Sequence, residues 1–201
     1  MSARTVRRLN KLQNWFLRLM FQVGPGTPLP ALLWDSGMLD MELRVWREKK
    51  MLAHHLQGLG EDTLARQVWE QQVAQQWPGL AKEVEKICAK LGIESVTTTR
   101  LEVKCYRKLV TKACHSKNEE NLRKASESIK KCERIALNKY GKQEYFSEKN
   151  LENARNMFKT RFGMTDLAGN FKNYMKFKLS SHLCKCKKRN RNRTPYSVWT
   201  M

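Results

Sequence analysis

The stretch Ser116–Gly141, which reads SKNEENLRKASESIKKCERIALNKYG, indicates the fold class. Its apolar residues recur at alternating intervals of three and four residues, as on one face of an α-helix: Leu122, Ala125, Ile129, Cys132 and Ala136. Ser116 and Glu119 have the spacing of a capping box, and Gly141 is a typical helix end. The stretch therefore predicts a long helix that begins at Ser116 and ends at Gly141.

The helical period continues toward the N-terminus. A first helix is predicted before the break at Gly24–Pro28, with the following residues turned toward the core: Leu9, Leu12, Phe16, Leu19, Met20 and Val23. Asp40 is a predicted N-cap, and the helix that it opens is predicted to end at Gly58. Pro78 is predicted to open a further helix that ends at Gly92.

Toward the C-terminus, Ser147 is predicted to cap a last helix that ends at Gly163, with inward residues Leu151, Ala154, Phe158 and Phe162. Alternating patterns long enough for a strand are scarce. We therefore predict an all-α fold, an irregular assembly of about seven or eight helices with a disordered basic C-terminal tail. Three regions are expected: a helical region 1–96, a basic helical region 97–180, and a tail 181–201 with an incomplete Cys knuckle.

The chain is strongly basic. Its 201 residues carry a net charge of +20, and about half of that excess lies in residues 151–201, which hold 12 cations and 2 anions. A field of this sign favours polyanionic partners. We expect non-specific binding of RNA or DNA, with no membrane and no small-molecule substrate as partner. No apolar stretch approaches the roughly 20 residues that a membrane span needs.

The C-terminal cations are the first candidate nucleic-acid site. They are Lys172, Lys176, Lys178, Lys185, Lys187, Lys188, Arg189, Arg191 and Arg193. The run from Lys185 to Arg193 can bind phosphates or act as a nuclear address, and it can equally be a solvated tail without a role. Among these cations, Phe171, Tyr174 and Phe177 can stack on bases, although packing in a last irregular turn is the more common outcome.

A second basic segment lies at the N-terminus. Residues 1–34 contain no acid and five cations, which are Arg4, Arg7, Arg8, Lys11 and Arg18. This basic face, with Trp15 nearby, can lie on a nucleic-acid backbone, although a packed tryptophan is more common. The pattern also resembles a mitochondrial presequence, but bulky side chains such as Trp15 and a shortage of serine oppose import. We expect an intracellular protein, located in the nucleus or the cytoplasm.

The sequence offers no catalytic constellation. It contains four aspartates, and none is paired as two-metal phosphoryl transfer requires. Phosphate-binding glycine loops and nucleophile-elbow motifs are also missing. His54 and His55 are adjacent on a predicted helix, so their side chains point about 100° apart and cannot hold one ion together. One is expected to face the core and the other solvent. We expect that the chain is not an enzyme.

A partial metal-binding motif lies near the C-terminus. His182, Cys184 and Cys186 place three soft ligands within five residues. A structural zinc site needs four ligands, and no further Cys or His follows in the sequence. Because a half site binds metal weakly, we expect no cofactor, zinc included. The other cysteines stand singly and are expected to be buried thiols: Cys88, Cys105, Cys114 and Cys132.

Two stretches carry recurring motifs. The first contains Leu12-Gln13-Asn14, Val23-Gly24, Thr27-Pro28 and Leu33-Trp34-Asp35-Ser36-Gly37-Met38-Leu39 through Arg44, with Trp77-Pro78-Gly79-Leu80 further on. The second contains Ala154-Arg155-Asn156-Met157-Phe158-Lys159-Thr160-Arg161, Met164, Asn170-Phe171-Lys172-Asn173 and Leu183-Cys184-Lys185-Cys186. Both resemble the region that follows the polymerase core in reverse transcriptases of non-LTR, LINE-type retrotransposons. Asp40 stands where that family usually has a proline.

The resemblance implies a segment truncated at both ends. The family's fingers, palm, catalytic aspartates and endonuclease would lie upstream of Met1, and its knuckle normally continues beyond the position of Cys186. The implied function is that of a non-catalytic fragment of the polyprotein that retains non-specific RNA or DNA binding. Two alternatives stay open: a helical protein-interaction module, and an inert remnant with no nucleic-acid role. An active polymerase is not supported, because the two-metal carboxylates are missing.

Overall fold

The computed structural model describes residues 2–94, 101–127, 129, 139–147 and 150–162. Within these residues the fold is all-α, as predicted, and no strand is present. Its elements are α1 (Ala3–Phe21), α2 (Leu29–Ser36), α3 (Met41–Gln57), α4 (Leu64–Ala74), α5 (Leu80–Leu91), α6 (Val103–Glu127), the 3₁₀ helix η3 (Glu144–Ser147) and α7 (Leu151–Arg161). The chain divides into two compact units, residues 1–143 and 144–201, which are described separately.

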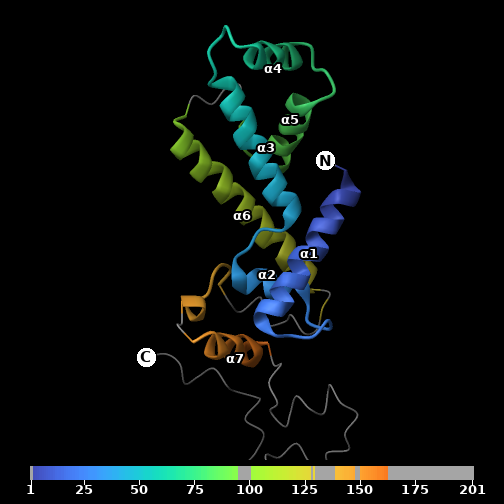
Figure 1. The fold of residues 1–201 in the computed structure, drawn as a ribbon, viewed down its shortest axis with the longest axis vertical. Helices are drawn as coiled ribbons and strands as arrows, with labels where there is room; N and C mark the ends of the chain where they lie inside the picture. Colours follow the sequence, from blue (N-terminus) through green and yellow to red (C-terminus); the bar gives the residue numbers. More distant parts are fainter. Residues whose placement is uncertain (1, 95–100, 128, 130–138, 148–149, 163–201) are drawn as a thin grey trace, which may run out of the picture. The chain divides into compact units, whose positions relative to one another are not determined.

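Helix α3 is the centre of the first unit. It packs against α1, α4, α5 and α6, and Figure 1 shows it between α6 on one side and α1 on the other. The main core lies where α3, α5 and α6 meet, and its buried residues include Leu43, Ala53, Val84, Cys88, Tyr106, Val110 and Cys114. Helix α6 also contacts α2, so it belongs to the same compact unit as the preceding helices. The expected boundary at residue 96 lies outside the described residues.

Local sequence signals account for several helix ends. The Asp40 carboxylate accepts a hydrogen bond of 2.8 Å from the backbone N–H of Leu43, which confirms the predicted N-cap of α3. The same helix ends before Gly58, and α5 ends before Gly92, which adopts the left-handed conformation. The predicted start of α5 was early, because Pro78 lies in a turn and the helix begins at Leu80.

The predicted start of the long helix at Ser116 is wrong. Helix α6 begins at Val103 and runs without interruption through Ser116. Its buried residues recur at every fourth position, in a row that continues across the predicted boundary: Tyr106, Val110, Cys114, Asn118, Leu122 and Ser126. Ending the helix near His115 would remove half of this row from its contacts with α2 and α3, so tertiary packing overrides the local capping signal.

The segment 139–143 is anchored on α2. The backbone N–H groups of Gly141 and Gln143 donate to the carbonyl oxygens of Trp34 and Asp35, both at 3.2 Å. The Tyr140 ring meets the Trp34 ring edge to face, with centroids 5.4 Å apart. The predicted helix end at Gly141 is wrong, because α6 ends at Glu127 and residues 139–141 are not helical. Residues 130–138 lie outside the described residues.

In the second unit, α7 packs against η3. The predicted cap Ser147 is wrong: it is the last residue of η3, and the side chain of Asn150 caps α7 by accepting from Glu152 N–H at 2.9 Å. Three predicted inward residues are buried, namely Ala154, Phe158 and Phe162, whereas Leu151 is exposed. Leu151 is the first residue of the helix, where its side chain has no preceding turn to cover it.

Candidate nucleic-acid interface

The C-terminal candidates lie outside the described residues. This holds for the nine cations from Lys172 to Arg193, for the incomplete knuckle His182, Cys184 and Cys186, and for the aromatic residues among them. Their predicted roles stay predictions. The described part of the chain nevertheless contains two other basic surfaces, one on α1 and one on α6.

Helix α1 buries a partly polar face. Gln13, Leu17 and Phe21 are its most buried residues. The Gln13 amide donates to the carbonyl of Leu39 at 2.8 Å, and the Asn10 side-chain oxygen accepts from Met41 N–H at 3.0 Å. These hydrogen bonds tie α1 to the link between α2 and α3 and satisfy backbone groups that would otherwise need water.

The predicted inward face of α1 is therefore wrong. Leu12, Phe16 and Leu19 are exposed, because the helix is rotated so that Gln13 and Leu17 meet α2 and α3 instead. Trp15 is also exposed, with 64% of its surface accessible, rather than packed as a tryptophan commonly is. Leu12, Trp15, Phe16 and Leu19 have helical spacing and form one outward row, which we call the apolar row.

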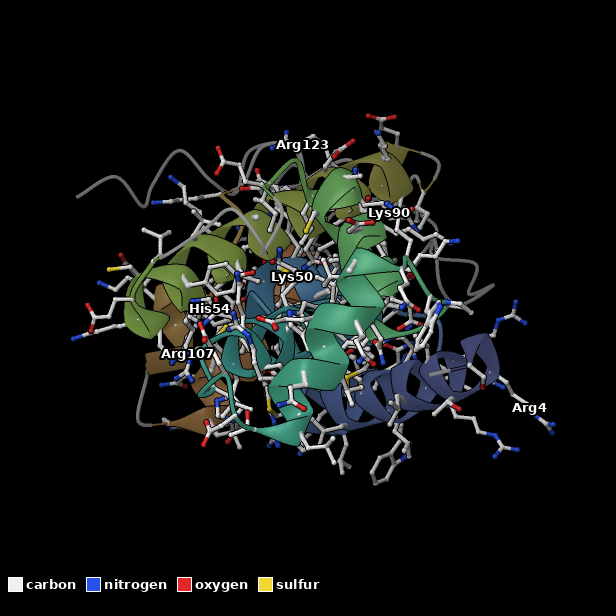
Figure 2. The ribbon with its side chains drawn as sticks, turned by 90° about the horizontal axis from the view of Figure 1, so that it is seen from above. Arg4, Lys50, His54, Lys90, Arg107 and Arg123 are labelled. Carbon is white, nitrogen blue, oxygen red and sulfur yellow. The ribbon has the colours of Figure 1, made fainter. Side chains whose placement is uncertain are left out.

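Four exposed cations occupy the N-terminal half of the same helix. Arg4, Arg7, Arg8 and Lys11 are exposed, and the stretch 1–34 holds no carboxylate. None of the four forms an ion pair with a described residue. Figure 2 shows Arg4 extending from the free end of α1 away from the other helices. Exposed cations without nearby carboxylates keep their full attraction for a phosphate backbone. We call these four residues the α1 cations.

Among the described residues, the cations in the N-terminal half of α6 form no ion pairs, whereas those in its C-terminal half do. Its N-terminal half exposes Lys104, Arg107, Lys108 and Lys112, and Glu102 is the one nearby acid in the sequence. In its C-terminal half, Lys117 and Lys124 both bind the Glu120 carboxylate, at 2.8 and 2.5 Å, and Arg123 binds Glu119. Hydrogen bonds from the two lysines lower the pKa of Glu120 to about 2. The cations in the C-terminal half of α6 are thus paired with glutamate carboxylates.

The two unpaired basic surfaces are separate. Arg4 on α1 and Arg107 on α6 lie on opposite sides of the first unit in Figure 2, and α3 runs between the two helices in Figure 1. A short, straight oligonucleotide can therefore contact the α1 surface or the α6 surface, but not both at once. The α1 surface differs from the α6 surface in having large exposed aromatic side chains, Trp15 and Phe16, directly beside its cations.

A pocket of about 500 Å³ lies between the C-terminal half of α3 and the start of α6. Its lining is mostly apolar, from Met51, Leu52, Leu59 and Val103, with His54 and Arg107 among the polar residues. His54 stacks on the buried Tyr106 ring, with centroids 4.2 Å apart, and its Nε2 lies 2.9 Å from the carbonyl of Leu101. His55 is exposed, so the two histidines diverge as predicted.

Metal-ligating side chains do not converge in the described part of the chain. No group of three or more His, Cys, Asp or Glu residues there could hold an ion. None of the described helices is long and apolar enough to cross a membrane. Comparison with known protein families, with curated proteins and with solved structures finds no match to this chain.

Proposed function

We propose that this protein binds RNA or DNA without sequence specificity through the outer face of α1. The observation that supports the proposal is the set of α1 cations, which are exposed and lack carboxylate partners among the described residues. Backbone binding is governed by such cations, because each phosphate that is neutralised releases condensed counterions. We further propose that the basic C-terminal tail contributes to the same binding.

The exposed aromatic residues extend this interface. Trp15 lies one turn after Lys11 on the same side of the helix, Phe16 is the next residue, and both are accessible. Aromatic side chains beside a basic groove or surface stack on unpaired bases, and each stacked base contributes about 1–3 kcal/mol in proteins of this kind. The α1 face therefore favours single-stranded over duplex nucleic acid.

We propose that the chain derives from the post-polymerase region of a non-LTR retrotransposon reverse transcriptase, and that it acts as a non-catalytic fragment. This proposal rests on the motifs around Leu33–Leu39 and Ala154–Arg161. The flanking genomic sequence, translated in all frames, tests it. Polymerase motifs upstream and a His/Cys knuckle downstream would support this origin, and clean introns with an unrelated neighbour would reject it.

Substitution of the α1 cations tests the binding proposal. A variant with Arg4→Gln, Arg7→Gln, Arg8→Gln and Lys11→Gln should bind a fluorescent single-stranded RNA more weakly than the unchanged chain. Because each phosphate contact contributes about 0.7 to the log–log salt slope on single strands, the slope should decrease by about 3. Fluorescence anisotropy over a salt series, on RNA, single-stranded DNA and duplex DNA, measures both quantities.

The matched control removes four cations that have carboxylate partners. Arg66, Lys117, Arg123 and Lys124 each bind a glutamate in the structure, so their replacement by Gln gives the same loss of net charge. The control should retain most of the salt slope. Equal log–log salt slopes for the two variants would contradict a local role for α1. They would show that the net charge of the chain determines the salt dependence. No binding by the unchanged chain at low salt would favour an inert remnant.

The apolar row favours a second candidate function, a helical protein-interaction module. Large exposed side chains at helical spacing are typical of a helix that docks into an apolar groove of a partner. The two functions differ in salt dependence, because apolar docking is nearly insensitive to salt whereas phosphate binding is not. A partner whose binding is lost in Leu12→Ser/Leu19→Ser, but retained when the α1 cations are replaced, would support this second function.

A further inference from the structure

A buried lysine and a buried cysteine are in contact inside the first unit. Lys50 lies on α3 and Cys88 on α5, 38 positions apart in the sequence. The ammonium Nζ donates to the Sγ atom at 2.9 Å. Lys50 has no accessible surface and Cys88 retains 5%. Figure 2 shows Lys50 in the interior, among the helices, unlike the outward-pointing Arg4.

The Lys50 nitrogen contacts a sulfur atom and an aromatic ring. Its second contact is the face of the Tyr106 ring, with Nζ 5.5 Å from the centroid. No carboxylate of the described residues forms an ion pair with Lys50, whereas the adjacent Lys49 pairs with Glu83. The described neighbours of the Lys50 nitrogen are therefore a sulfur atom and an aromatic ring rather than a carboxylate.

The geometry points to a peroxide-dependent covalent link between Lys50 Nζ and Cys88 Sγ, a sulfenamide that staples α3 to α5. In the first step the Cys88 thiolate attacks hydrogen peroxide: an S–O bond forms, the O–O bond breaks, and the departing hydroxide takes a proton from the Lys50 ammonium to become water, which leaves the amine neutral. The lone pair of the neutral Lys50 amine then attacks the sulfur. An N–S bond forms, the S–O bond breaks, and the departing hydroxide takes a proton from nitrogen.

Overall, one amine, one thiol and one peroxide give one N–S bond and two waters, with the peroxide as the two-electron oxidant. The amine needs no approach step, because its nitrogen already lies within hydrogen-bond distance of the sulfur. Such preorganisation replaces a bimolecular capture by an intramolecular one. Hydrogen peroxide is close to water in size, and the Cys88 residue retains 5% of its accessible surface.

Two other cysteines of the described residues serve as internal comparisons. Cys114 is buried, but its thiol donates weakly to the carbonyl of Leu43 at 3.7 Å, and burial raises its pKa to about 11. Cys105 is exposed, so its prediction as a buried thiol is wrong. Neither thiol forms a hydrogen bond to a lysine nitrogen of the described residues, although the Lys50 charge is close enough to Cys114 to lower the pKa of that thiol slightly.

Mass spectrometry of the full chain tests the proposal directly. The reduced protein is freed of reductant, treated with hydrogen peroxide, alkylated with N-ethylmaleimide and digested. We expect a linked pair of peptides that contain Lys50 and Cys88, with the summed mass of the two less two hydrogen atoms. Dithiothreitol should separate the pair, because thiol attack on the sulfur breaks the N–S bond. Recovery of Cys88 solely as alkylated thiol, as a disulfide, or as sulfinic or sulfonic acid would overturn the proposal.

Neighbouring lysine variants make the test specific. Lys50→Met, which fits the buried site without a charge, should lose the linked pair, whereas Lys49→Met on the same helix should retain it. Circular dichroism of both variants checks that the fold is kept. The unchanged protein should also unfold at a higher temperature after peroxide treatment, since a covalent cross-link between α3 and α5 restrains the unfolded chain. A linked pair that persists in Lys50→Met would place the bond on another amine and contradict the assignment.

Discussion

Buried polar side chains hold the segment 139–143 against α6. The Asn118 amide nitrogen donates to the Tyr140 hydroxyl at 2.8 Å and to the carbonyl of Met38 at 3.1 Å. The Tyr140 hydroxyl also lies 3.1 Å from His115 Nδ1, which can accept its proton when the imidazole is neutral. Burial lowers the pKa of His115, and the nearby Arg47 charge lowers it further. The folded protein therefore favours neutral His115.

This preference makes stability depend on pH. The pKa of an unfolded histidine is about 6.5. Because the folded value is lower, the unfolded chain binds more protons between the two values, and the free energy of unfolding should fall as pH decreases below about 6.5. The loss should level off once the folded protein is protonated as well. Urea unfolding between pH 8 and pH 5 measures this decline, and His115→Gln should remove part of it.

The matched control for that measurement is His55→Gln, which makes the same substitution at an exposed histidine of α3. An identical decline in the unchanged protein and in His115→Gln would show that other groups cause the effect.

The end of α2 depends on a glycine for two reasons. Gly37 follows the last residue of the helix at a φ of +63°, a left-handed conformation that strains other residues. A Cβ atom at this position would also lie 2.5 Å from the backbone nitrogen of Lys142. Gly92 ends α5 at the same φ, but a Cβ atom there would meet nothing within 4 Å. A substitution at Gly92 therefore tests conformational strain alone, whereas a substitution at Gly37 tests strain together with close packing.

Alanine substitution should distinguish these contributions. Gly92→Ala should lower the free energy of unfolding by about 1 kcal/mol, the cost of the left-handed conformation. Gly37→Ala should cost about 2–3 kcal/mol, because the backbone of segment 139–143 must also move away. Chemical denaturation of both variants measures the difference. Equal losses would mean that the segment gives way freely and that its packing on α2 contributes little.

The charge of the chain is distributed unevenly between paired and unpaired regions. In the described part, glutamates of α6 neutralise the cations around them, whereas the α1 cations lack such partners. The C-terminal cations lie outside the described residues, so their contribution is known from the sequence alone. If binding is electrostatic, both sets of cations should add to the salt slope, because distant phosphate contacts act independently.

Truncation of the tail tests this additivity. Removal of residues 185–201 deletes six cations, which are Lys185, Lys187, Lys188, Arg189, Arg191 and Arg193. The log–log salt slope should fall by about 4 on single strands and about 5 on duplex. Replacing the α1 cations in the truncated chain should lower it further. Equal affinities and slopes for the full and truncated chains would exclude the tail from binding.

Local chemistry explains what could be predicted from the sequence. The helical class, the N-cap Asp40 and the helix ends at Gly58 and Gly92 depend on residues within one or two turns of each other. The α1 cations were also identifiable, because charge is a property of composition. In contrast, the exposure of Trp15 and the start of α6 at Val103 were not predicted.

Those features depend on partners that are distant in the chain. The buried face of α1 is chosen by the hydrogen bond of Gln13 to Leu39, and α6 is held through Ser116 by packing on α2 and α3. The contact between Lys50 and Cys88 likewise forms only when α3 and α5 meet. Apolar periodicity limits which faces a helix can bury. The backbone groups and side chains of the neighbouring helices then select among those faces, because buried polar groups must find partners.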